Sequence, residues 1–167
     1  MKVDNQKGDV LTITLIFVAI ALIIFTFVIA VFMSHINNVL YNLKIDMYSM
    51  NKSAIIAVNK YSSSIDRFSY NIEAYKEEFI KFLKSNYKLN DELSNSEKLI
   101  TSIEIKEYTI YERGHKDQYT DEICDVRTIH TVLKVKIKPI ILKSILEDIF
   151  VFTIHEDVAL SSMKTER

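Results

Sequence analysis

The sequence predicts an α+β protein with a long N-terminal transmembrane helix that extends into an amphipathic helix, then a second helix, then a three-stranded antiparallel β-meander. Three observations predict it. An uncharged apolar run covers Val10–Met33, an apolar stripe with helical spacing follows it, and the apolar period changes to two in the last third of the chain. No internal repeat is visible.

The apolar run Val10–Met33 contains no charged residue, no Gly and no Pro, and its polar members are three threonines. As a helix it would span ~36 Å, enough for the ~30 Å hydrocarbon core of a bilayer with some tilt. A buried core helix of a soluble domain and a cleaved secretory signal are the alternatives. The run is long for either one, so we expect an uncleaved anchor, or a helix trimmed only ahead of it.

The helical pattern continues beyond the span, since no Gly or Pro occurs between Ser34 and Ser62. Apolar or aromatic residues recur with a 4-3-4-3-4-3-4 spacing at Ile36, Leu40, Leu43, Met47, Met50, Ala54, Ala57 and Tyr61. We therefore expect one helix from about Val10 to Lys60, with Asn51 among the residues off the stripe. The central part of the stripe, here called the interface stripe, comprises Leu43, Met47, Met50, Ala54 and Ala57. It would pack on the chain's own domain, which we favour, or on a partner helix.

A second helix is expected from about Ile65 to Tyr87, with Ser62–Ser64 as a source of caps. Its stripe consists of Phe68, Ile72, Tyr75, Phe79 and either Phe82 or Leu83. Glu77 and Lys81 have the spacing of an i,i+4 ion pair. The aromatic character of this stripe indicates core packing rather than a cofactor site.

Three segments with period-two alternation predict the sheet. The first covers Ile103–Ile110 with a register shift before Tyr108, the second covers Ile129–Lys138 and ends at Pro139, and the third covers Phe150–Val158. In the second, one face carries Ile129 and every alternate residue to Ile137. The other face, with His130, Val132, Lys134, Lys136 and Lys138, is expected to be wet.

The expected domain boundaries follow from these elements. They are a short polar leader at 1–9, a transmembrane helix at 10–33, its extramembrane continuation at 34–61, a helix-plus-sheet domain at 62–160 and a polar tail at 161–167.

Composition excludes several classes of function. The net charge of −1 gives no field that would attract nucleic acid, and a single Cys cannot form an internal disulfide. Lysines are balanced on the two sides of the span, so charge alone leaves its orientation open.

The sequence carries no pattern typical of a catalytic, metal or cofactor site. His35, His115, His130, His155 and Cys124 lack the close spacing of zinc ligands. His130 and His155 could be neighbours on adjacent strands with Asp157 near, but we expect solvent-facing sheet positions. No nucleophile elbow, phosphate loop or H-E-x-x-H motif occurs. We therefore expect no enzyme, no cofactor and no metal.

The layout resembles the pilin-like class, and most closely the TadE/TadF-type pseudopilins of tight-adherence pilus systems. The residues that carry the resemblance are Lys7-Gly8 directly before Asp9-Val10, and the strand Lys134–Pro139 followed after a short connection by Phe150–Ile154. The resemblance implies processing by a prepilin peptidase between Gly8 and Asp9. The Glu that this family usually carries five residues after the Gly is Ile13 here.

The resemblance thus implies a non-enzymatic single-pass protein of the cell membrane, a minor pseudopilin or structural component of a pilus- or secretion-type assembly. Its domain would be extracytoplasmic, and its partners would be the lipid bilayer and other pilin-like or envelope proteins. The alternative is a membrane-tethered partner-binding or sensor module of a secretion or conjugation apparatus.

Overall fold

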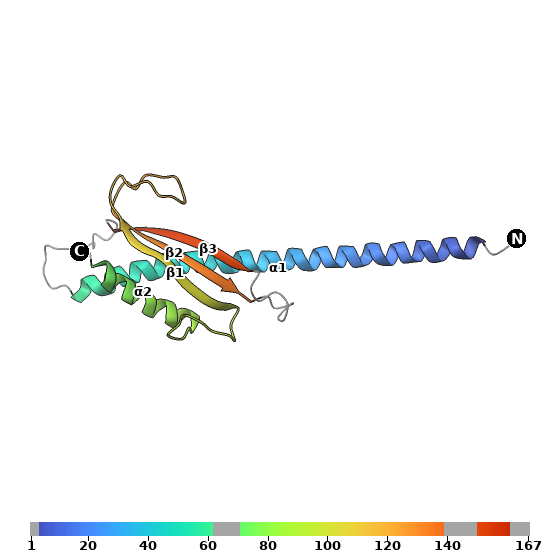
Figure 1. The fold of residues 1–167 in the computed structure, drawn as a ribbon, viewed down its shortest axis with the longest axis horizontal. Coiled ribbons are helices and arrows are strands. Elements are labelled where there is room, and N and C mark those ends of the chain that lie inside the picture. Colours follow the sequence, from blue (N-terminus) through green and yellow to red (C-terminus); the bar gives the residue numbers. More distant parts are fainter. Residues whose placement is uncertain (1–3, 62–70, 139–149, 161–167) are drawn as a thin grey trace. The chain divides into compact units, whose positions relative to one another are not determined.

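The computed structural model describes residues 4–61, 71–138 and 150–160. Two helices precede three strands: α1 (Asp4–Tyr61), α2 (Ile72–Tyr87), β1 (Ile100–Tyr111), β2 (Thr128–Ile137) and β3 (Val151–Ala159) (Figure 1). The chain divides into two compact units, Met1–Tyr41 and Asn42–Arg167, which are described separately. The predicted order of long helix, second helix and three antiparallel strands is confirmed.

The first unit contains the apolar part of α1, and its side chains are exposed from Val10 to Val31. The hydroxyl of Thr14 donates to the carbonyl of Val10 and that of Thr26 to the carbonyl of Ile23, both at 2.9 Å. These polar groups are therefore satisfied within the helix, as a hydrocarbon environment requires. The segment is long and apolar enough to cross a membrane once, and the chain is compatible with a single-pass membrane protein.

The second unit is built on a β1-β2-β3 sheet in which both neighbouring pairs are antiparallel. The expected register shift in the first strand is present, between Ile105 and Glu107. Alternation along β2 places Ile129, Thr131, Leu133, Val135 and Ile137 on one face, here called the inner face, and all five are buried. The opposite face of the sheet is called the outer face.

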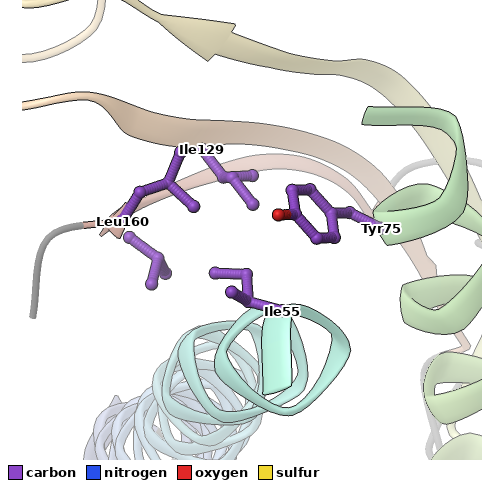
Figure 2. Close-up of a cluster of buried hydrophobic side chains, with 5 residues drawn as sticks. Ile55, Tyr75, Ile129 and Leu160 are labelled. Atoms are coloured by element: carbon purple, nitrogen blue, oxygen red, sulfur yellow. The ribbon is translucent and has the colours of Figure 1, made fainter. Parts of the chain in front are cut away.

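Side chains from both helices cover the inner face. Ile55 of α1 and Tyr75 of α2 pack with Ile129, Val158 and Leu160 in one apolar cluster (Figure 2). Thr131 of the inner face exchanges hydrogen bonds with Asn51 of α1: the Asn51 amide donates at 3.0 Å and the Thr131 hydroxyl donates back at 3.3 Å. These contacts fix how the C-terminal part of α1 lies on the sheet.

Helix α2 begins at Ile72, and the earlier part of the predicted second helix lies outside the described residues. The side-chain oxygen of Asn71 accepts a hydrogen bond from the amide of Ala74 at 3.1 Å and caps the helix, which starts at Ile72. Its end at Tyr87 agrees with the prediction, and Lys88 closes it in the left-handed conformation. The buried face is Tyr75, Phe79 and Leu83.

The predicted ion pair of Glu77 and Lys81 needs correction. Lys81 pairs at 2.6 Å with Glu78, three residues before it, rather than with Glu77. The predicted caps at Ser62–Ser64, the helix before residue 71, Pro139, the connection at 140–148 and the tail at 161–167 lie outside the described residues.

Candidate functional site

The interface stripe is already covered within the second unit. Leu43, Met47, Met50 and Ala54 are buried and Ala57 is half-buried, although no partner chain is present. The packing on the chain's own domain, favoured above, accounts for this burial. A partner helix that used the same residues would have to displace the sheet.

The buried face of α1 is wider than the predicted stripe, because it also includes Asn51 and Ile55. Asn51 was expected off the stripe, and that expectation is wrong. A line with 4-3 spacing describes contact with one narrow partner, whereas a sheet contacts a broader face that adds the positions next to the line. The burial of Asn51 was not predicted because the residue is polar. The signal that could have indicated it is Thr131, a polar residue on the apolar face of β2 whose hydroxyl accepts a hydrogen bond from Asn51.

Gly8 and Asp9, the predicted processing site, lie within the first turns of α1, which begins at Asp4. Cleavage there stays a prediction.

The outer face of the sheet holds the cluster that sequence reasoning missed. His130 of β2 was expected to face solvent, but its side chain is 0% exposed. The segment 112–127 that joins β1 to β2, here called the β1–β2 loop, carries two groups to this face, Asp117 and Tyr119. The alternation of polar and apolar residues along a strand does not show whether a loop covers one face of the sheet. The burial of His130 could therefore not be predicted from the alternation alone.

The β1–β2 loop has a structure of its own. Lys116 and Ile123 form an antiparallel bridge, and Gly114 turns the chain with φ +87°, a conformation that Gly adopts without strain. The carboxylate of Asp117 accepts the Tyr119 amide at 2.9 Å and the Thr120 hydroxyl at 2.7 Å, which orders the tip. At the neck, the Nε of Arg127 reaches the Glu112 carboxylate at 2.5 Å.

His130 is held from several directions. Its Nδ1 lies 2.6 Å from Oδ1 of Asp157, its partner across the β2–β3 pairing. Its ring stacks on Tyr111 of β1 at 4.4 Å between centroids and on Tyr119 of the loop at 5.5 Å. Nε2 is buried without a hydrogen-bond partner among the described residues, so the ring is oriented through Nδ1 and its faces.

Two further histidine rings lie against these tyrosines. His115 of the loop lies 4.0 Å from Tyr111, and His155 of β3 lies 5.0 Å from Tyr119, again between centroids. His130 and His155 are neighbours on adjacent strands, the arrangement that the sequence left open, and their ring centroids are 6.4 Å apart.

The carboxylates around His130 set its charge. Burial alone would lower its pKa, but the hydrogen bond and charge of Asp157, with the charges of Glu107 and Asp117, outweigh burial and raise the pKa above the ordinary 6.5. For Asp117, burial would raise the pKa, but donation from Tyr119 and Thr120 outweighs it and the pKa is lowered. The arrangement favours a cationic His130 beside anionic carboxylates.

Burial, followed by the charges of Asp157 and Asp117, raises the pKa of the Cys124 thiol in the same loop. The thiol is therefore a poor nucleophile here, because the thiolate is the reactive form.

Asp117, His130 and Asp157 are also the residues that could hold a metal ion, since each offers a ligand atom within 4.8 Å of the others. However, Nδ1 of His130 and Oδ1 of Asp157 are 2.6 Å apart, a hydrogen-bond distance. Two ligands of one tetrahedral Zn²⁺, each ~2.0–2.1 Å from the ion, would be roughly 3.3 Å apart. The distance between Nδ1 and Asp157 therefore fits a shared proton better than two ligands of one ion.

Comparison of the chain with protein-family models, with curated proteins and with solved structures finds no match.

Proposed function

We propose that this chain is a non-enzymatic, single-pass protein of the cell membrane and a structural component of a pilus- or secretion-type envelope assembly, similar to a TadE-like minor pseudopilin. The observation that carries the proposal is helix α1, which is apolar and exposed in its N-terminal part and carries a packed α+β domain on its C-terminal part. The partners proposed are the lipid bilayer and other pilin-like or envelope proteins, with the domain outside the cytoplasm.

The sequence supports the absence of catalysis in this proposal. It lacks the nucleophile, phosphate-loop and metalloprotease motifs, and the buried His130 cluster has the geometry of a structural ion pair. We do not propose any role in a filament that depends on that Glu, because Ile13 stands where the family usually carries it.

Two measurements on cells that express the full chain test the proposal. Intact-mass analysis of the membrane fraction is expected to show loss of Met1–Gly8, and Gly8→Val is expected to abolish this loss. Protease added outside protoplasts is expected to degrade the domain. A domain that is protected until the membrane is permeabilised, and so faces the cytoplasm, would exclude the proposal.

The second candidate function is a membrane-tethered partner-binding or sensor module. The buried cluster of ionisable groups on the outer face supports it, because such groups gather at functional sites as well as in structural ion pairs. Photo-cross-linkers in place of Met50 and of the exposed Ile56 distinguish the two uses of α1. A cross-link from Met50 to another part of the chain's own domain is expected; a cross-link from Met50 to another protein would support the interface-stripe alternative instead.

A further inference from the structure

The outer-face cluster joins side chains from β1, the β1–β2 loop and β3 around a residue of β2. Asp157 comes from β3, Glu107 and Tyr111 come from β1, and Asp117 and Tyr119 come from the β1–β2 loop. His130 lies at the centre of all of them. Three further titratable groups lie near this ring: His115 and Cys124 of the loop, and His155 of β3.

The β1–β2 loop reaches His130 through Asp117 and Tyr119. Two ring contacts also join the loop to the strands, His115 on Tyr111 and Tyr119 on His155. The Lys116–Ile123 bridge, the Lys116–Asp121 pair and the Glu112–Arg127 pair at the neck are internal to the loop. A loop with its own hydrogen bonds can move as a body about its neck without unfolding. Its attachment to the outer face then rests on these ring contacts and on the interaction of His130 with Asp117 and Tyr119, and of these only the interaction with His130 includes a carboxylate of the loop.

A protonated His130 attracts both of these groups. The cation neutralises part of the charge of Asp117, Asp157 and Glu107, and a cationic ring interacts favourably with the faces of Tyr111 and Tyr119. A neutral imidazole would leave three carboxylates near one another with no cation among them. Buried or half-buried like charges in that arrangement repel one another. Asp117 is the carboxylate that can move away, because the loop carries it.

We propose that the β1–β2 loop is a proton-controlled cover of the sheet's outer face, held down by protonated His130 and released when His130 loses its proton. Release exposes Tyr111 and His130, which are buried in the closed form. The cover is closed below the raised pKa of His130 and opens as the pH rises through that pKa. Tyr111 stays neutral throughout, since burial and Glu107 raise its pKa to about 12.

The test is a pH titration of the full chain in lipid nanodiscs, with two readouts. Nitrogen-15 NMR of labelled histidines follows the charge of His130, and hydroxyl-radical footprinting follows the accessibility of Tyr111, with the exposed Tyr41 as internal reference. Between about pH 6 and pH 9 the labelling of Tyr111 relative to Tyr41 is expected to rise at least about threefold, with a midpoint equal to that of His130.

Variants separate the cover from a general loosening. Asp157→Asn is expected to move both midpoints to lower pH together. His155→Gln is the matched control, because His155 also stacks on Tyr119 but has no carboxylate partner among the described residues, and it is expected to leave the titration unchanged. His130→Gln is expected to give pH-independent labelling.

The wild-type titration decides the matter even if His130→Gln fails to fold. Constant labelling of Tyr111 while His130 titrates would overturn the proposal, and so would a His130 that does not titrate in this range. A rise that follows the titration of His155 rather than His130 would overturn it as well.

Discussion

The two faces of the sheet are buried by different means. The inner face is covered by two helices, through apolar side chains and one neutral pair of hydrogen bonds between Asn51 and Thr131. At His130, the outer face is covered by a loop through a histidine, carboxylates and aromatic rings. Burial on the inner face therefore does not depend on protonation, whereas burial on the outer face does. Substitutions on the two faces should therefore differ in how their effects on stability vary with pH.

Ile55→Ala is expected to destabilise the second unit by about 2–5 kcal/mol, because it removes a fully buried side chain from the inner-face cluster and leaves a cavity. The matched control is Ile56→Ala, one residue along the same helix and 52% exposed, which is expected to change the free energy of unfolding by less than about 0.5 kcal/mol. Urea titration in detergent, followed by tyrosine fluorescence, measures both. Equal effects would mean that the inner face is not the main core.

Asp157→Asn is expected to cost about 1.5–3 kcal/mol near neutral pH, since it removes the charged acceptor of a buried histidine. The pKa of His130 is raised by folding, so its contribution is fully present below the ordinary value of 6.5 and is lost as the pH rises through the raised value. The difference between wild type and variant should therefore shrink with rising pH. A difference that grows with pH would contradict the charged pair.

Asn51→Ala is expected to cost about 1–3 kcal/mol, because Thr131 is left buried without its partner. The double variant Asn51→Leu, Thr131→Val replaces both partners by apolar groups of similar size and is expected to recover most of that loss. Unlike Asp157→Asn, neither effect should vary between about pH 6 and pH 9. A double-mutant cycle from urea titrations gives the coupling, and strictly additive losses would show that the two side chains do not interact.

Asn71→Ala is expected to cost about 1 kcal/mol through loss of the α2 cap, whereas Asn71→Asp should retain it. The effect reports on the inner face, because α2 supplies Tyr75 to the cluster. Helical circular dichroism during thermal unfolding provides the measurement. No loss on Asn71→Ala would mean that α2 is held by its apolar face alone.

Sequence periodicity predicted the inner face well and the outer face poorly. The alternation from Ile129 to Ile137 and the stripe at Tyr75 and Phe79 are direct consequences of apolar residues facing a core, and both are observed. His130 was expected to be solvated because its neighbours on that face include Lys134 and Lys136. The loop that buries it is set by contacts between residues distant in sequence, which no local pattern records.

The candidate site was foreseen only in part. Adjacent strands were enough to place His130 near His155 and Asp157, because antiparallel pairing of the second and third strands was predicted. Asp117 could not be placed, since it lies in a loop whose direction depends on Gly114 and on the turn that Asp117 itself forms. Asn51 was missed for a simpler reason: a polar residue inside a core is found only through its partner.

The chain contains one cysteine, and it lies in the β1–β2 loop. Its raised pKa makes the Cys124 thiol slow to react while the loop is closed, because burial and the carboxylates of Asp157 and Asp117 disfavour the thiolate. The protein therefore carries a native chemical reporter of that loop. The rate at which an alkylating reagent consumes this single thiol, corrected for ordinary thiol ionisation, would follow opening of the loop in intact membranes without any engineered label.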